Sequence, residues 1–229
     1  MTSYAPINRV QENREKGNHT TVVADKEFEV KESVFSPELF FTTKWLATVF
    51  PYPKPDEKFL EMGCGCGVQS ILVALNGCKN VTASDINPAA AESVKINAKR
   101  HGVTVKAVTS DLFENIEGTF DVLYWNFPMM QPTEDTEISD DVVFRSEYDP
   151  GCQLMTRFFQ QAGKYITPNG RILFTMTPQL GDQQKFETIL RETGWQFTTP
   201  LSKNFPTGQE EEFVTFQLHC ITRKANKAA

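Results

Sequence analysis

Apolar residues in this chain follow two alternating periods from about residue 58 onward. Val68, Ile71, Leu72 and Leu75 lie at the i, i+3, i+4 and i+7 positions of one helix face, and the short apolar runs on either side of them are typical of buried strands. The alternation of strand and helix predicts βαβ units, right-handed crossovers and a mostly parallel sheet. The pattern predicts strands at residues 58–63, 80–85, 103–110, 120–126, 171–176, 195–199 and 212–223, and helices at residues 68–75, 88–101, 152–166 and 182–193.

Turn residues separate these elements. Asn87 is typical of a helix N-cap with Pro88 at the first helical position, and residues 167–170, Thr-Pro-Asn-Gly, are expected as a turn. A further helix is expected to begin at residues 36–37, before the alternation starts. The last two strands follow each other without a helix, so we expect an antiparallel hairpin in which His219 lies on the exposed face.

These elements predict an α/β fold: a Rossmann-like, doubly wound, mostly parallel seven-stranded sheet with an antiparallel C-terminal strand. Residues 1–20 are polar and without periodicity, and short β-like pieces follow them, so residues 1–33 are interpreted as an N-terminal arm or extension. Residues 34–229 are interpreted as a single domain, because the sequence contains no internal repeat.

The composition narrows the class of protein. The net charge of −6 argues against a nucleic-acid partner, because phosphate binding favours a basic face. No run approaches the roughly 18 apolar residues of a membrane helix, and the N-terminus has no apolar signal-peptide core, so we expect a cytoplasmic protein. The five scattered cysteines are typical of free thiols, and Cys64 and Cys66 have no second pair at zinc-ligand spacing, so no metal site is expected.

Polar residues and glycines stand at the carboxyl ends of four predicted strands, the edge at which parallel sheets bind ligands. The first strand runs into glycines at every second position, which let the backbone pass close to a ligand. The second strand ends in an acid suited to ribose hydroxyls, the third in an acid beside an apolar residue, and the fourth in an amide. These residues are Glu61, Gly63, Gly65, Gly67, Asp85, Asp111, Leu112 and Asn126.

Two classes of cofactor fit a glycine loop and a ribose-binding acid. A dinucleotide favours G-x-G-x-x-G, but here Val68 stands where the third glycine should be. Glu61, just before the loop, would repel a pyrophosphate and tolerate a sulfonium or ammonium group. The pattern therefore favours S-adenosylmethionine over a nicotinamide cofactor.

The motifs FLEMGCGCG, ASDINPAA and SDLFENIEGTFDVLYWNFP resemble the successive motifs of class I S-adenosylmethionine-dependent methyltransferases. The pattern is similar to the release-factor glutamine methyltransferase group, and VFSPELFFTTKWL resembles the segment before its cofactor site. The resemblance implies that Glu61, Gly63, Gly65 and Gly67 surround the methionine part of the cofactor. It further implies ribose binding by Asp85, adenine contacts from Ile86, Asp111 and Leu112, and a closing role for Thr43.

The same resemblance assigns the chemistry to the end of the fourth strand. In that group an Asn-Pro-Pro-Tyr motif accepts hydrogen bonds from a substrate NH₂ through the Asn side chain and the next carbonyl. Asn126 and Phe127 match these acceptors, with Pro128 lending rigidity, and Asn126 also borders the cofactor. Phe127 and Met129 stand where the group has Pro and Tyr, which makes both candidates for contact with the methyl acceptor and indicates an acceptor other than the group's glutamine.

A strongly acidic segment follows this motif. Seven acids stand between residues 134 and 149 with Arg145 as the one base, and we interpret the segment either as a solvated loop or as a rim that attracts a cationic acceptor. His19, His101 and His219 are not expected to be catalytic bases.

The sequence thus predicts a methyltransferase that acts on a nitrogen of a protein side chain or a small molecule. Two alternatives remain open: an RNA or DNA adenine-amino methyltransferase, against which the missing basic stripe argues, and a scaffold that binds the cofactor and activates a partner without chemistry. A nicotinamide oxidoreductase is disfavoured by Glu61 and the displaced glycine.

Overall fold

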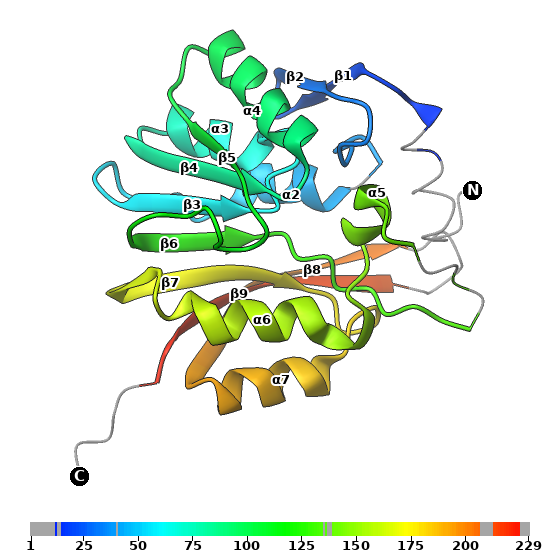
Figure 1. The fold of residues 1–229 in the computed structure, drawn as a ribbon, viewed down its shortest axis with the longest axis vertical. Coiled ribbons are helices and arrows are strands. Elements are labelled where there is room, and N and C mark those ends of the chain that lie inside the picture. The colour runs from blue at the N-terminus through cyan, green and yellow to red at the C-terminus, as the bar shows by residue number, and fades with distance from the viewer. Residues whose placement is uncertain are drawn as a thin grey trace.

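A computed structural model describes residues 12, 15–39, 41–134, 136, 139–206 and 213–224. Its main sheet has seven strands in the order β5-β4-β3-β6-β7-β9-β8 (Figure 1). The first five strands in this order, β5, β4, β3, β6 and β7, pair in parallel. Strand β9 pairs antiparallel with both β7 and β8. The predicted fold class is therefore confirmed. The strands are β3 (Lys58–Met62), β4 (Asn80–Asp85), β5 (Lys106–Thr109), β6 (Phe120–Trp125), β7 (Ile166–Met176), β8 (Trp195–Pro206) and β9 (Phe213–Arg223).

Helices cover both faces of the sheet. The crossovers α3 and α4 lie with α2 on one face, and α6 and α7 lie on the other (Figure 1). Apolar side chains that alternate along each strand fill the two layers, so that Leu123 and Trp125 face α6 whereas Val122 and Tyr124 face α2. The helices are α2 (Phe41–Val49), α3 (Val68–Leu75), α4 (Pro88–Arg100), the short α5 (Val142–Arg145), α6 (Gln153–Ala162) and α7 (Gln183–Glu192).

The N-terminal segment contributes a small hairpin of β1 (His19–Val23) and β2 (Lys26–Val30). Phe28 and Val30 are fully buried in the apolar cluster that α3 and α4 share. The Asn97 side chain accepts from the Glu29 N–H at 2.8 Å and donates to the Cys66 carbonyl at 2.9 Å. The hairpin is thus bonded to the loop that precedes α3, while the proposed boundary at residue 33 stays a prediction.

Several boundaries differ from the sequence prediction. Strand β7 starts at Ile166 and includes the predicted turn 167–170, because Ile166 pairs with Phe120 ahead of a register shift. Strand β8 has 12 residues in place of the expected five, and α2 begins at Phe41. In contrast, α3 and β4 have the predicted bounds, and Asn87 caps α4 by accepting from the Ala89 N–H.

The expectation that His219 is exposed is wrong. β9 lies inside the sheet between β7 and β8, and only 1% of His219 is exposed, with its ring packed on Phe186 and Phe197. Burial lowers the pKa of His219 to about 4, so the ring is neutral at pH 7. None of the described helices is long and apolar enough to cross a membrane.

Candidate active site

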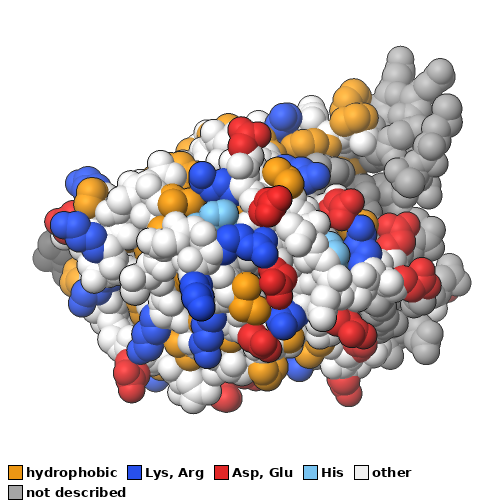
Figure 2. Space-filling view, turned by 90° about the horizontal axis from the view of Figure 1, so that it is seen from above, with side chains coloured by type: hydrophobic (Ala, Val, Ile, Leu, Met, Phe, Trp, Pro, Cys, Tyr) orange, Lys and Arg blue, Asp and Glu red, His pale blue; other side chains and the backbone are white. Residues whose placement is uncertain are grey.

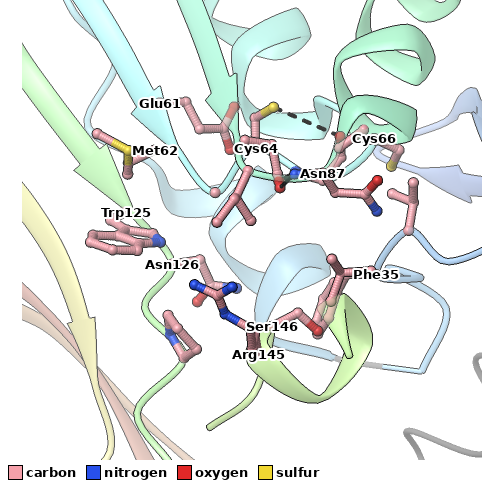
Figure 3. Close-up of a pocket in the computed structure, with 18 of the residues that line it drawn as sticks. Phe35, Glu61, Met62, Cys64, Cys66, Asn87, Trp125, Asn126, Arg145 and Ser146 are labelled. Atoms are coloured by element: carbon pink, nitrogen blue, oxygen red, sulfur yellow. Dashed lines mark hydrogen bonds between the residues drawn. The ribbon is translucent and has the colours of Figure 1, made fainter. Parts of the chain in front are cut away.

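A pocket that is open to solvent lies at the carboxyl ends of the strands β5, β4, β3 and β6 (Figure 3). This first pocket gathers most of the residues that the sequence singled out, from four separate strand ends and from α2. Its lining includes Thr43, Glu61, Gly63, Gly65, Asp85, Ile86, Asp111, Leu112, Asn126 and Pro128.

The glycine loop after β3 has a left-handed backbone and close neighbours. Gly63 has a φ of 59°, and a Cβ on it would lie 2.6 Å from the Trp125 Nε1 atom. Gly67 does not line the pocket: it precedes α3 with a φ of 83°, and a Cβ there would lie 2.8 Å from a Val94 methyl. The third glycine therefore serves the close packing of the loop against α4.

Asp85 ties the glycine loop to the end of β4. Its carboxylate accepts from the Gly65 N–H at 2.9 Å and from the Asn87 N–H at 2.9 Å. Burial nonetheless raises the pKa of Asp85 above its usual value. A carboxylate fixed by two backbone donors at this edge suits a pair of ribose hydroxyls.

Glu61 is a buried acid, with 5% of its surface exposed. Its Oε2 atom accepts from the Ser70 N–H at 2.8 Å and from the Ser70 hydroxyl, both at the start of α3. Burial raises the pKa of Glu61 to about 8 in spite of these bonds. A positive group beside Glu61 would favour its ionised form, and this suits a cationic ligand better than a pyrophosphate.

Asp111 and Leu112 form the wall beyond β5. The Oδ2 atom of Asp111 bonds Arg157 at 3.0 Å, whereas its Oδ1 atom is buried and has no hydrogen-bond partner among the described residues. Leu112 is buried and has a φ of 47°. An orphaned acceptor beside an apolar side chain fits an adenine amino group, so the residues present match S-adenosylmethionine.

Asn126 directly follows β6, and its side chain is hydrogen-bonded to a residue of β7. The Thr175 hydroxyl lies 2.9 Å from Asn126 Oδ1 and accepts from the Phe127 N–H at 2.9 Å. The Phe127 ring stacks on Phe174 with centroids 4.8 Å apart, so this side chain belongs to the core. Phe127 thus anchors the turn through its ring and its N–H, and a contact of its carbonyl with an acceptor stays a prediction.

A second, smaller pocket adjoins the first. Phe35, Asn126, Pro128 and Ser146 border both pockets. The second pocket adds further, mostly apolar residues, namely Thr42, Phe127, Met129, Met130, Glu147, Leu180 and Phe216. Met129 and Phe127 therefore pack in the core and also border this pocket, and their contact with an acceptor stays a prediction.

The acidic segment after Met130 is not uniformly solvated. Asp149 is 2% exposed, and its carboxylate accepts from the Leu154 and Met155 N–H groups at the start of α6. Glu147 is 4% exposed. These two of the seven acids are thus parts of the interior, while Glu134 and Asp140 are exposed.

Both ends of this segment are fixed. Met130 donates to the Glu147 carbonyl at 3.0 Å and accepts from the Asp149 N–H at 3.0 Å. The Gln131 side chain bonds the Asp149 carbonyl at 2.7 Å and the Gly151 N–H at 2.9 Å. The two ends of the acidic segment are therefore bonded to each other, at Met130 and Gln131 on one side and at Glu147 and Asp149 on the other.

Sequence reasoning missed several pocket residues. Trp125 reads as an ordinary core residue at a strand end, but its indole nitrogen faces the glycine loop (Figure 3). Arg145, on α5, extends into the first pocket near Asn126. Its isolation as the one base of an acidic segment was the available signal. Phe35 could have been found from its place in the segment before α2.

The cysteines and histidines have structural environments. Within the described part of the chain, no group of His, Cys, Asp and Glu is placed to hold a metal ion. Cys64 and Cys66 are buried, and burial raises the pKa of Cys66 to about 12, so its thiolate is disfavoured at neutral pH. His19 bonds the Gly17 carbonyl and Ser36, and His101 bonds the Glu27 carbonyl.

Comparison with known proteins gives consistent similarities. A family model described as the methyltransferase small domain matches residues 25–199. A putative protein N5-glutamine methyltransferase of Methanocaldococcus jannaschii is 32% identical over 156 residues, which are 68% of this chain and 78% of that protein. A ribosomal protein L11 methyltransferase of Thermosipho africanus is 38% identical over 93 residues, but these are 40% of this chain and 36% of that protein. The solved structure of ribosomal protein L11 methylase from Lactobacillus delbrueckii subsp. bulgaricus has a TM-score of 0.56 and 18% identity, with 80% of each chain covered.

Proposed function

The chain belongs to the methyltransferase small domain family, and from this premise we propose that it methylates a nitrogen atom of a protein side chain. As a member of this family, the chain is an S-adenosylmethionine-dependent methyltransferase, as the sequence motifs predicted. When bound, the cofactor supplies an activated methyl group on a positive sulfur. The chain's own residues then have to bind the donor, orient a nucleophile and exclude water.

Binding of the donor is the proposed task of the first pocket. Asp85 would hold the ribose hydroxyls, and Asp111 and Leu112 would hold the adenine, with Ile86 at its edge. Glu61 would complement the positive charge of the methionine part. Gly63 leaves room for the Trp125 indole, and Gly65 brings the backbone close to Phe35 on the opposite wall.

The observation that carries the proposal is the position of Asn126 on the border of both pockets. Its side-chain oxygen and the Phe127 carbonyl are acceptors for the two N–H groups of an attacking NH₂. Such bonds direct the nitrogen lone pair toward the first pocket, where the methyl group is expected. Pro128 fixes the backbone that follows.

A protein acceptor is favoured by the second pocket and by the relatives. Phe35, Met129 and Phe216 give this pocket apolar walls, which suit the aliphatic stem of a side chain. The two relatives described above are named as methyltransferases of a protein glutamine and of a ribosomal protein. Both names support a nitrogen on a protein surface as the acceptor.

A nucleic-acid acceptor is the weaker alternative. Figure 2 shows one face on which Lys and Arg side chains have Asp and Glu side chains among them. On this chain Lys31 and Arg100 lie within 4 Å of Glu29, so part of the basic charge is already paired. The net charge of −6 also disfavours phosphate binding.

Methyl transfer to fractionated acceptors tests the proposal. Labelled S-adenosylmethionine and the purified protein are added to an extract from cells that lack it, which is then separated into protein, nucleic acid and small molecules. We expect the label in the protein fraction, on a base-stable nitrogen. Label confined to nucleic acid or to small molecules would refute a protein acceptor, and the Asn126→Ala protein is the control for enzyme-dependent transfer.

A further inference from the structure

We propose that Thr175 is a positioning residue that orients Asn126 for methyl transfer. Thr175 lies near the end of β7, directly beside the strand that ends before Asn126. The β6–β7 register pairs Trp125 with Phe174, which brings Thr175 level with Asn126. Only 1% of Thr175 is exposed, so its hydroxyl contacts protein groups in place of bulk water.

The Thr175 hydroxyl meets three groups of the Asn126 turn. It accepts from the Phe127 N–H at 2.9 Å, and its own proton has two possible acceptors. Asn126 Oδ1 is 2.9 Å away, whereas the Trp125 carbonyl is 3.5 Å away, so the proton is directed to Asn126. With the proton donated to Oδ1, the oxygen of the carboxamide lies on the Thr175 side and its NH₂ group on the other.

One buried atom, Thr175 Oγ1, therefore fixes the orientation of both the Asn126 side chain and the Asn126–Phe127 peptide. One lone pair of Oδ1 is used by Thr175, and the other remains for a substrate N–H. Without the hydroxyl the carboxamide would rotate more freely, and the Phe127 N–H would be a buried donor without a partner. The role rests on the proposed function of Asn126 and deepens it.

Three variants test this role through methyl transfer to the protein fraction of the extract. Thr175→Val keeps the shape and removes the hydroxyl, so we expect kcat to fall about tenfold or more, with the KM for S-adenosylmethionine within about twofold of wild type. Thr175→Ser restores the hydroxyl and should restore most of the rate. Thr177→Val is the matched control, because Thr177 is also buried near the end of β7 but its hydroxyl has no partner among the described residues.

The outcomes separate this inference from the proposed function. A fully active Thr175→Val protein beside an inactive Asn126→Ala protein would overturn the positioning role and leave Asn126 in place. An active Asn126→Ala protein would overturn both. If Thr175→Val fails to fold, Thr175→Ser decides, because a folded Ser variant as slow as Asn126→Ala would show that the hydroxyl does not act. The double variant with Asn126→Ala should be no slower than Asn126→Ala alone.

We infer independently that Arg145 binds the carboxylate of the methionine part of the cofactor. Among the described residues that line the first pocket, the ionisable side chains other than thiols and Tyr124 are three acids and one base. The acids are Glu61, Asp85 and Asp111, and the base is Arg145. Figure 3 shows the Arg145 guanidinium on the pocket side of α5, near Asn126.

The charges of the ligand match this set. S-adenosylmethionine has one anionic group, its α-carboxylate, and two cationic groups, its ammonium and its sulfonium. No described carboxylate of the chain lies within salt-bridge distance of Arg145. A guanidinium binds a carboxylate with two parallel N–H bonds. The α-carboxylate is therefore the group of the cofactor that matches Arg145.

Decarboxylated S-adenosylmethionine isolates this contact, because it lacks only the group in question. Calorimetry on the full chain should show that Arg145→Gln weakens S-adenosylmethionine binding about tenfold or more, and decarboxylated cofactor by less than about twofold. Arg191→Gln is the control and should change neither affinity, because Arg191 is exposed in the last turn of α7.

Equal losses for both ligands would overturn the assignment, since they would report a general change in the pocket. Unchanged binding of both ligands with a raised KM for the protein acceptor would also overturn it, and would place the guanidinium on the acceptor. The test measures binding alone, so it stands whether or not the acceptor is a protein.

Discussion

The first and second pockets meet at Asn126, but they are built in different ways. The first pocket is made from the ends of neighbouring parallel strands, so that Glu61, Asp85 and Asp111 converge because the sheet brings its carboxyl ends together. The second pocket instead joins Met129, after β6, and Leu180, after β7, with Phe216 on the antiparallel strand β9. If the first pocket binds the donor and the second the acceptor, as proposed, then the donor site follows from one repeated local arrangement. The acceptor site then depends on segments that only the complete fold brings together.

The largest effect is expected from the removal of Asp85, the acid proposed to bind the ribose. Asp85→Ala should abolish measurable S-adenosylmethionine binding by calorimetry, because both the ribose contact and the anchor of the Gly65 N–H are lost. Asp182→Ala is the control: it removes the N-cap of α7, which should cost about 1 kcal/mol of stability and leave cofactor affinity unchanged. An unchanged affinity in Asp85→Ala would refute the first pocket as the donor site.

Asn126 lies where the two pockets meet, so its variant should separate their functions. Asn126→Ala is expected to keep the cofactor affinity within a few fold and to lower turnover by about a hundredfold, since the nitrogen of the acceptor is no longer oriented. Calorimetry with S-adenosylhomocysteine and labelled-methyl transfer measure the two effects. Equal loss of binding and turnover would assign Asn126 to the cofactor alone.

The smallest effect concerns the charge of Glu61. Its pKa of about 8 lies above its usual value, so the folded protein holds a proton that the unfolded chain releases, and this contribution to stability is lost as pH rises from about 4.5 through 8. A cationic cofactor favours ionised Glu61 and should release this proton on binding. The affinity should therefore rise between pH 6 and pH 8, by at most about tenfold per pH unit.

Calorimetry at three pH values, in two buffers of different ionisation enthalpy, measures this rise and the proton release. Glu61→Gln is the matched variant and should show a flatter dependence, with its melting temperature used to confirm folding. An affinity of the native protein that does not change with pH would show that Glu61 does not meet the positive part of the cofactor.

The sequence predicted the parts of the molecule that follow from local periodicity. The bounds of α3 and β4, the cap at Asn87 and the glycine loop all depend on residues a few positions apart. The burial of His219 could not be predicted in the same way, because it depends on the position of β9 between β7 and β8 and on the packing of Phe186, from α7, against its ring. The length of β8 was not predictable either, because the strand is largely exposed and the stretch Thr-Thr-Pro at residues 198–200, where the register shifts, interrupts its apolar alternation.

The contacts around the active turn show the same limit. Thr175 is 49 residues from Asn126, and only the parallel register of β6 and β7 places its hydroxyl on the carboxamide. Arg145 belongs to a helix of 4 residues, too short to give a periodic pattern. For Phe127 the sequence indicated contact with an acceptor, and the structure adds a second role, since its ring packs on Phe174.

The hydrogen bonds that hold together the two ends of the acidic segment allow its length to vary. Met130 and Gln131 are bonded to the returning chain at Glu147 and Asp149, so the ends of the loop stay together whatever lies between them. Loop-closure entropy grows only slowly with length, so insertions and deletions within residues 132–141 should cost little stability. The sequence and length of this segment can therefore change without disturbing the strand ends that line the first pocket.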